Sequence, residues 1–260
     1  MQKLKTKRKV FGNLKERERA ILNVLYENEQ ISTAQLCEKF DISIVTLRKD
    51  LDNLEANGLV VRTHGRVTSA YSKAIIERQK ANADEKTRIA KAAAAMIEEG
   101  DRVMIVAGTT TALIPKFLLG KRNIHIVTNS TLLLTYSRVN PGLSVTLVGG
   151  EFMADAEALI GSIALKDLDL FYVKSSFIGA DGFSEVGGIT ANHVELAGIC
   201  RKVIANSQQK ILLADSSKYG KKGFAYIDDL KNLSTLITDK QIADSDAMKL
   251  SNLGLDIIKV

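Results

Sequence analysis

Apolar residues recur at helical spacing in three short stretches near the start of the chain. Residues 15–28 carry a broad apolar stripe, which predicts a first helix. Ser32 is a suitable N-cap for a second helix over residues 33–40. Ser43 is a suitable N-cap for a third helix, and this helix ends at Gly58 because glycine favours the conformation that terminates helices. The tight break between the last two helices predicts a helix-turn-helix.

The third helix separates its side chains into two faces. One face is apolar and consists of Leu47, Leu51 and Leu54. The other face points outward and consists of Val45, Arg48, Lys49 and Asp52. Residues 59–70 are β-prone around a turn that contains glycine, so they predict a basic hairpin. Three helices followed by such a hairpin indicate a winged helix-turn-helix, whose third helix lies in the DNA major groove.

The outward face of the third helix has the chemistry that DNA requires. Arg and Lys can bond phosphates or guanine edges, and Val45 can pack on a thymine methyl group. The expected DNA-contacting residues are Thr33, Ser43, Ile44, Val45, Thr46, Arg48, Lys49, Arg62, His64 and Arg66. The alternative is an ordinary three-helix surface with scattered charges. The caps, the turn, the outward cations and the wing together favour DNA binding.

The pattern changes after the hairpin. Residues 70–83 lack a clear period and are interpreted as a linker, and residues 84–100 predict a long helix. Short apolar runs then alternate with helical stretches, the first of which covers residues 112–119. The runs are residues 102–107, 124–128, 144–150, 175–182, 210–215 and 233–239. This alternation predicts an α/β fold with a parallel sheet covered on both faces.

Length and composition support two domains in one chain. The 260 residues are 45% hydrophobic and 25% charged, which is enough for two cores. The expected organisation is a basic arm (1–14), a winged helix-turn-helix domain (15–69), the linker (70–83) and an α/β domain (84–260). The net charge is +6, and the first 20 residues hold eight basic against two acidic side chains. A basic arm points toward nucleic acid, although a solvated leader has the same composition.

Several classes of protein are disfavoured. No apolar run approaches the ~20 residues of a membrane helix, and no apolar core of a secretory signal follows the basic N-terminus. A cytoplasmic protein without a membrane segment is expected. Cys37 and Cys200 are solitary, so neither a disulfide framework nor a paired metal site is indicated.

Polar, glycine-rich segments follow the apolar runs of the second domain. In open parallel sheets, ligands bind at the carboxyl ends of the strands. Backbone N–H groups, hydroxyls and Lys218 can hold a phosphate there, while Asp181 and Asn129 can bind hydroxyl groups. The pattern predicts a site for a phosphorylated, polyhydroxylated small molecule. The expected ligand-binding residues are Gly108, Thr109, Thr110, Thr111, Thr128, Asn129, Ser130, Gly149, Gly150, Asp181, Glu195 and Lys218.

Catalytic chemistry has little support in the sequence. Asp181, Glu195 and Lys218 are acid–base candidates, but no Ser/His/Asp or Cys/His arrangement follows from the spacing. His, Cys and Asp do not cluster at metal-ligand spacing, and the phosphate-binding loop of ATPases is absent. No catalytic residue, metal or cofactor is therefore expected.

Several motifs resemble the DeoR family of bacterial transcriptional regulators over nearly the whole chain. The N-terminal motifs are Phe40-Asp41-Ile42-Ser43, Thr46-Leu47-Arg48-Lys49-Asp50-Leu51, Leu54, Gly58 and Arg62-Thr63-His64-Gly65. The later motifs are Gly108-Thr109-Thr110, Thr128-Asn129-Ser130, Gly149-Gly150, Phe177-Ile178-Gly179-Ala180-Asp181-Gly182 and Leu213-Ala214-Asp215-Ser216-Ser217-Lys218. The resemblance implies a repressor, less often an activator, of sugar or nucleoside catabolism genes, with a sugar-phosphate effector. It also implies a homo-oligomer and a sensor domain similar in fold to ribose-5-phosphate isomerase and coenzyme A transferases.

Three features depart from the family pattern. Val106 stands where an acidic residue is usual, and Arg66 replaces a second glycine in the wing. An arginine that is common after Gly149-Gly150 is replaced within the segment Phe152, Met153 and Ala154. Arg66 adds positive charge where a wing meets the DNA backbone. The loss of an acid and a base near the ligand loops keeps open a sensor that acts without ligand.

An enzyme of the same fold is a further alternative. Sugar-phosphate isomerases of this fold carry an Asp-Gly-Ala-Asp segment, whose paired carboxylates serve acid–base chemistry. Here the segment is Ile178-Gly179-Ala180-Asp181, so binding without turnover is the better interpretation. We therefore expect a DNA-binding repressor of sugar catabolism genes. Its expected partners are double-stranded operator DNA, a sugar phosphate and further copies of itself, as a dimer or a tetramer.

Overall fold

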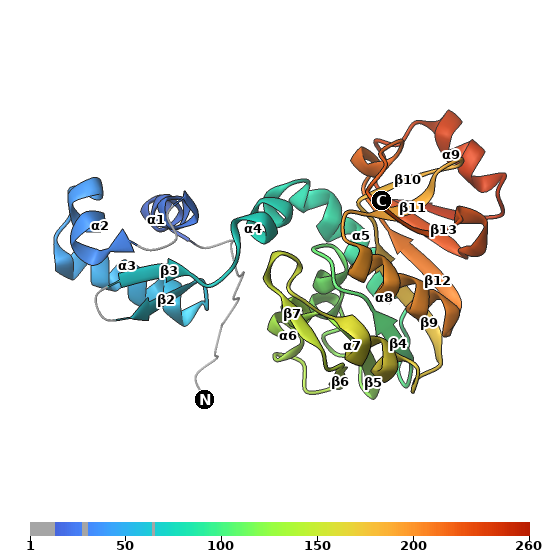
Figure 1. The fold of residues 1–260 in the computed structure, drawn as a ribbon, viewed down its shortest axis with the longest axis horizontal. Helices are drawn as coiled ribbons and strands as arrows, with labels where there is room; N and C mark the ends of the chain where they lie inside the picture. The colour runs from blue at the N-terminus through green and yellow to red at the C-terminus, as the bar shows by residue number, and fades with distance from the viewer. Residues whose placement is uncertain (1–13, 28–30, 64–65) are drawn as a thin grey trace. The chain divides into compact units, whose positions relative to one another are not determined.

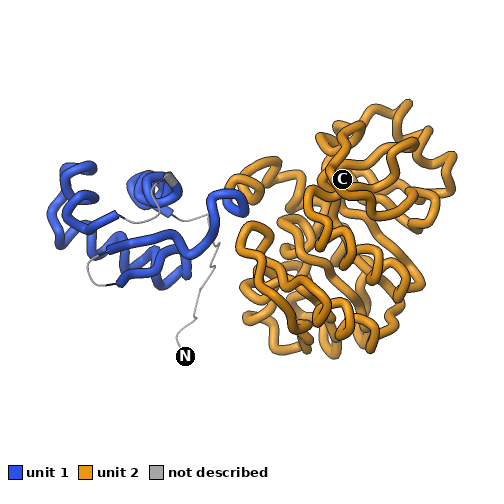
Figure 2. Tube along the Cα trace, viewed as in Figure 1, with its two compact units in different colours: residues 1–76 blue, residues 77–260 orange. Residues whose placement is uncertain are grey.

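The chain divides into two units between residues 76 and 77 (Figure 2). The computed structural model describes residues 14–27, 31–63 and 66–260. The boundary falls inside helix α4 (Lys73–Lys80), so one helix belongs to both units. The basic arm predicted over residues 1–14 lies outside the described residues, except for Leu14, which is buried.

The described part of the first unit contains the predicted helices and hairpin (Figure 1). Before α4 its elements are α1 (Glu16–Glu27), β1 (Ile31–Ser32), α2 (Thr33–Phe40), α3 (Ile44–Ala56), β2 (Val60–Thr63) and β3 (Arg66–Ser69). The three strands form an antiparallel sheet in the order β1-β3-β2. The hairpin register runs from Val60 opposite Ser69 to Thr63 opposite Arg66.

Helix α3 has the two faces that its sequence predicts. Leu47, Leu51 and Leu54 are at most 1% exposed and pack in the core of this unit, whereas Val45 is 59% exposed. The side chain of Ser43 accepts a hydrogen bond from the backbone N–H of Thr46 at 3.2 Å. This cap satisfies an N–H group that has no partner within the helix, and it fixes where α3 begins.

A seven-stranded parallel sheet forms the centre of the second unit, as far as the chain is described. Its strands are β4 (Arg102–Ile105), β5 (Ile124–Thr128), β6 (Leu143–Leu147), β9 (Val173–Gly179), β12 (Ser207–Leu213), β14 (Thr235–Thr238) and β15 (Asp256–Lys259). The helices are α5 (Ala83–Ala95), α6 (Thr131–Ser137), α7 (Gly161–Leu168), α8 (Val194–Ala205) and α9 (Asp244–Ser251). The strand order is β15-β14-β12-β9-β4-β5-β6.

The strand order reverses at the middle of this sheet. From β4 the chain continues to β5 and β6 on one side, and it later returns to add β9, β12, β14 and β15 on the other. The carboxyl ends of β4 and β9 therefore flank a switch point, where a crevice opens in sheets of this kind.

Two small antiparallel sheets accompany the parallel one. Strands β7 (Glu151–Met153) and β8 (Ala158–Ile160) form a hairpin between β6 and α7. Strands β10 (Gly182–Ser184), β11 (Gly188–Ala191) and β13 (Ala225–Asp228) form the other sheet, which Figure 1 shows near the C-terminus. The sequence pattern missed both sheets, whose strands have three or four residues.

Three predicted elements differ from the structure, and one strand was missed. Residues 70–83, interpreted as a linker, are largely helical because they contain α4. The buried apolar residues of α4, Ile75 and Ile76, are adjacent in sequence, so they show no helical spacing. Helix α5 ends at Ala95 rather than near residue 100. The stretch predicted as a helix over 112–119 is a 3-10 helix, η1 (Thr111–Phe117), because Pro115 lacks the N–H that an α-helix needs. Strand β15 was not predicted.

Candidate nucleic-acid interface and ligand site

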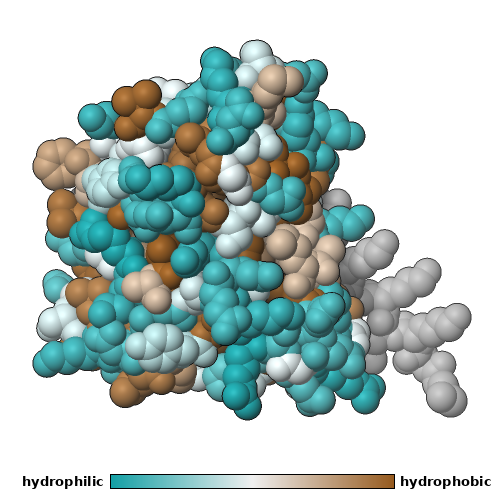
Figure 3. Space-filling model, turned by 90° about the vertical axis from the view of Figure 1, so that its right-hand side faces the viewer, coloured by the Kyte–Doolittle hydropathy of each residue, from teal (hydrophilic) through white to brown (hydrophobic). Residues whose placement is uncertain are grey.

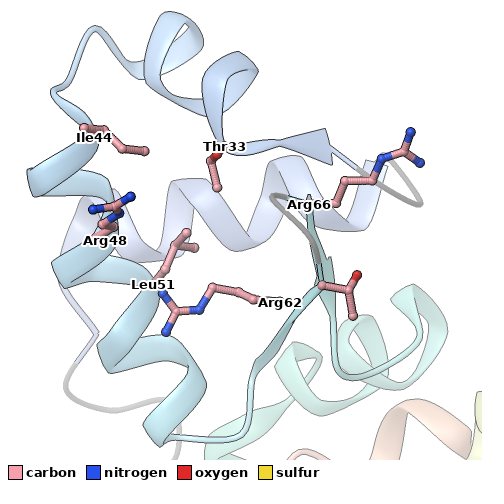
Figure 4. A pocket seen from close by; sticks show the side chains of 7 residues that line it. Thr33, Ile44, Arg48, Leu51, Arg62 and Arg66 are labelled. Carbon is pink, nitrogen blue, oxygen red and sulfur yellow. The ribbon is translucent and has the colours of Figure 1, made fainter.

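A pocket of about 240 Å³ lies between α3 and the β2–β3 hairpin (Figure 4). Its lining residues are Thr33, Ile44, Arg48, Leu51, Arg62, Thr63 and Arg66. Five of these residues belong to the predicted DNA-contacting set, so the structure brings helix and wing residues to one concave surface. Of the predicted set, His64 lies outside the described residues.

Two cations on α3 are available to a ligand. Arg48 and Lys49 are both exposed, and neither forms an ion pair with any residue in the described part of the chain. Ile44 and Val45, at the start of the same helix, are 40% and 59% exposed. Cations beside exposed apolar side chains match the phosphate groups and thymine methyl groups of a major groove.

Arg62 forms ion pairs with α3, and its expected DNA contact stays a prediction. Its guanidinium donates hydrogen bonds to Glu55 and to Asp52, the latter at 2.7 Å, and both acceptors belong to α3. These hydrogen bonds, the one to Glu55 first, raise the pKa of Arg62. The pairs neutralise the cation and join the hairpin to α3, so Arg62 holds the wing in place.

A buried polar cluster joins α1 to α3. Asp50 is fully buried and accepts hydrogen bonds from Nε and Nη2 of Arg17 at 2.5 and 3.2 Å. Glu18 is also fully buried, and it accepts from the side-chain amide of Asn53 at 2.9 Å and from the backbone N–H of Lys15 at 2.8 Å. The cluster fixes the orientation of α3, because a buried carboxylate requires its partners.

Four neighbouring strands of the second unit bring most of the predicted ligand loops together. Strands β12, β9, β4 and β5 are adjacent, and each carries one predicted segment at its carboxyl end. The loop from Gly108 and the segment that ends at Asp181 flank the switch point between β4 and β9. The structure thus places these loops at the edge where parallel sheets bind ligands.

Several predicted ligand residues are already used to build these loops. Asn129 is 1% exposed, its Oδ1 accepts from the N–H of Ala107 at 2.8 Å, and its Nδ2 donates to Leu159 at 3.0 Å. The hydroxyl of Thr128 donates to Ile105, while that of Thr111 donates to Val106 and Gly108. Ser130 caps α6. These side chains shape the crevice, and this structural role was not anticipated.

Other members of the predicted set have polar groups to offer. Thr110 makes no side-chain cap at η1, and Thr109 precedes it at the switch point. Asp181 is half-buried, and one carboxylate oxygen accepts from the backbone N–H of Asn192 at 2.8 Å. Glu195 is exposed and lies in the first turn of α8.

Lys86 was missed by the sequence reasoning. Its side chain on α5 is buried, and Nζ donates to the backbone oxygens of Arg78 and Ala81, the latter at 2.5 Å. Burial lowers the pKa of Lys86 to about 8; Asp215 opposes this shift and Lys218 adds to it. The sequence could have indicated its burial, because Lys86 lies on the apolar stripe of the predicted helix.

Gly149 and Gly150 follow β6, the edge strand beside β5. The N–H of Val148 donates to the carbonyl oxygen of Thr128 at 2.9 Å, so the pair lies next to the segment that follows β5. The N–H of Gly149 donates to Asp167 at 2.7 Å, and Gly150 has a φ of +137° with a Cβ position only 2.4 Å from the carbonyl oxygen of Ile160. The pair is needed for the close turn into the β7–β8 hairpin, so the two glycines in the sequence indicate a turn that requires their backbone conformation.

Sequence comparison identifies the two units. A family model described as a DeoR-like helix-turn-helix domain matches residues 17–73, and one described as a DeoR C-terminal sensor domain matches residues 81–240. The chain belongs to the DeoR family of transcriptional regulators. As a DeoR-family member it is a DNA-binding transcriptional regulator, and membership decides against the isomerase alternative.

Similar DeoR-family proteins include several repressors. The HTH-type transcriptional repressor GlcR of Bacillus subtilis (strain 168) is 34% identical over 92% of this chain and 93% of that protein. The lactose phosphotransferase system repressor of Lactococcus lactis subsp. lactis is 32% identical over 89% and 93%. The transcriptional repressor AccR of Agrobacterium fabrum is 30% identical over 88% and 91%.

Solved structures that resemble this DeoR-family chain include ribose-5-phosphate isomerases. The enzyme from Methanocaldococcus jannaschii is 22% identical over 54% of this chain and 55% of that chain, with a TM-score of 0.36. A complex of the isomerase with phospho-erythronic acid has a TM-score of 0.39 at 17% identity, over 53% of this chain and 54% of that chain.

Metal-binding clusters and membrane-spanning helices are both absent from the described residues of this DeoR-family chain. No group of His, Cys, Asp and Glu there has a geometry that could hold a metal ion. Among the same residues, no helix is both long and apolar enough to cross a bilayer.

Proposed function

We propose that this regulator represses sugar catabolism genes and that a sugar phosphate controls it. The main support is the row of polar segments at the carboxyl ends of the neighbouring strands β12, β9 and β4. Thr109 and Thr110 follow β4 and Lys218 follows β12, and charged donors with hydroxyl groups are the usual partners of a phosphate. Asp181 suits the hydroxyl groups of the sugar.

The similar proteins support the same class of target. Three of them are named as repressors, and one name refers to the lactose phosphotransferase system. The three names share the class of repressor, and we extend to this chain the link to carbohydrate use that one of them states. The operator is reached in the cytoplasm, so we also propose a cytoplasmic location.

DNA reading is proposed to need more than one copy of the chain. Helix-turn-helix proteins place paired recognition helices on successive major-groove turns, ~34 Å apart. The second unit exposes large apolar side chains that a homo-oligomer can cover, among them Tyr172 and Phe224 at 80% and 83% exposure. Figure 3 shows one face of this unit, where apolar patches alternate with polar ones. Arg48, Lys49 and Arg66 supply the cations for phosphate and base contacts.

The test is binding of the purified full-length protein to DNA upstream of its own gene. Salt is titrated with and without a panel of sugar phosphates, with inorganic phosphate as the anion control. We expect tight, competitor-resistant binding that weakens steeply with salt and shifts with one sugar phosphate. Binding that no ligand shifts would favour a ligand-independent regulator. The structural argument for it is that Val106 is buried and that Met153 and Ala107 pack against one small apolar cluster. Absence of specific binding would contradict the proposal.

Lys218 is expected to be needed for the response to ligand. Replacing Lys218 with alanine removes a cation from the proposed phosphate site. Ligand affinity should then fall roughly 10- to 150-fold, because a hydrogen bond to a charged group contributes about 1.5–3 kcal/mol. Calorimetric titration with the sugar phosphate found above measures the change, and operator affinity without ligand should stay the same.

Lys222→Ala is the matched control for this experiment. Lys222 is exposed and lies four residues further along the same segment. Its loss should leave ligand affinity unchanged. Equal losses in both variants would indicate a general charge effect and would exclude Lys218 from the site.

A further inference from the structure

The junction between α4 and α5 is bonded to the loop that carries Lys218. Asn82 lies between the two helices with a left-handed φ of +52°, and its side chain makes no cap for α5. Its Nδ2 instead donates to Oδ1 of Asp215 at 2.8 Å and to the hydroxyl of Ser217 at 3.1 Å. Asp215 and Ser217 are also hydrogen-bonded to each other. We refer to Asn82, Asp215 and Ser217 as the junction latch.

The loop on the far side of the latch is held to the sheets. The backbone N–H of Ser216 donates to the buried carboxylate of Asp239 at 2.7 Å, just after β14. The N–H of Gly220 donates to the carbonyl of Phe183 in β10 at 2.9 Å. Lys218 lies between these anchors, which oppose a shift of its backbone on both sides. A shift that does occur therefore moves the adjacent latch residues Asp215 and Ser217.

The junction side of the latch leads to the first unit through the chain itself. Helix α4 includes the last residues of the first unit and the first residues of the second. Lys86 donates to the carbonyl oxygens of Arg78 and Ala81, at the end of α4. The end of α4 is thus held by Lys86 and followed at once by Asn82, so a change at the latch alters how α4 leaves the second unit.

We propose that the junction latch couples ligand binding at Lys218 to DNA binding by changing the α4–α5 junction. This inference rests on the proposed function, since it requires a ligand that changes operator affinity. A ligand shifts such an equilibrium only if it binds the two states differently. Asn82 is a positioning residue in this scheme: it contacts neither DNA nor ligand, and it sets how strongly the two sites influence each other.

Asn82→Gly tests the latch with little backbone strain. Glycine adopts positive φ readily, so the variant removes the amide while keeping the junction conformation accessible. Asn123→Gly is the matched control, because Asn123 also has a positive φ, 59°, and is exposed ahead of β5 at the opposite edge of the sheet. Asn82→Asp is the second variant; it keeps the shape of Asn82 but replaces the donor with a carboxylate that repels Asp215.

The experiment measures operator affinity of the full-length proteins with and without the sugar phosphate that most affects the wild type. In both Asn82 variants we expect the ligand-induced change to fall to less than twofold. Ligand affinity without DNA and operator affinity without ligand should each stay within about threefold of the wild type. Asn123→Gly should keep the full wild-type response.

Hydrogen exchange of the ligand-free proteins gives an independent readout. Amides of residues 79–82 should exchange at least ten times faster in Asn82→Gly than in the wild type or in Asn123→Gly. A full response in Asn82→Gly, or unchanged exchange, would overturn the latch and leave the proposed function standing. A wild type without any ligand response would overturn the proposed function, and the coupling role of the latch with it.

Discussion

Replacing Arg48 with alanine should lower operator affinity about 5- to 150-fold, which corresponds to about 1–3 kcal/mol for an arginine that bonds a base edge. Arg48 lines the pocket between α3 and the hairpin, and it is an exposed cation without an ion-pair partner among the described residues. Its charge is therefore available to DNA. Fluorescence anisotropy with a labelled operator fragment measures the change.

The pattern of the loss distinguishes base reading from general attraction. Loss of a base contact should also relax preference at one operator position, whereas loss of a phosphate contact weakens all sequences alike. Arg138→Ala is the matched control, since Arg138 is an exposed arginine of the second unit, just after α6. Operator affinity equal in the two variants would refute the placement of Arg48 at the DNA.

Arg17→Ala should destabilise the first unit more than Arg19→Ala does, because it leaves the buried carboxylate of Asp50 without its main partner. Asp50 has 1% of its side chain exposed, and the remaining cation nearby, Lys15, is 3.9 Å away. The side chain of Arg17 is 39% exposed, so solvent screening reduces the stabilisation that the ion pair provides. Hydrogen exchange of the α3 amides in urea measures the loss in the full-length protein.

Two further variants separate the ion pair from general effects on α1. Arg19→Ala removes an exposed arginine from the same helix and should change stability by less than 0.5 kcal/mol. The double change Arg17→Met with Asp50→Leu should recover most of the stability, because an apolar pair avoids the cost of a buried charge. If Arg17→Ala is as stable as Arg19→Ala, the ion pair does not hold α3 in place.

The sequence was informative wherever one local pattern determined the outcome. The leucine stripe of α3 and the loops at the carboxyl ends of parallel strands were predicted because period and connectivity fix them. Asp50 lies on the same stripe as Leu47 and Leu51, so its burial was readable in retrospect.

Features that depend on distant partners were not predictable in this way. Whether Asn129 or Arg62 offers its polar atoms to a ligand depends on Ala107 and Glu55, residues that the fold brings into contact. The helical character of α4 depends on burial of Ile75, which its own polar sequence does not reveal. The order of residue types along the chain was enough to predict the function. The roles of single side chains became visible only in the folded structure.

The β7–β8 hairpin gives this protein a separate site for evolutionary change. Met153 packs against the same small apolar cluster as Ala107, the residue before Gly108, while Phe152 of the same strand is 53% exposed. The two strands of the hairpin pair with each other and add no strand to the parallel sheet. Mutations in this hairpin can therefore alter the wall of the crevice while the sheet and α3 stay intact. Ligand preference can diverge among descendants of one gene while operator recognition is inherited unchanged.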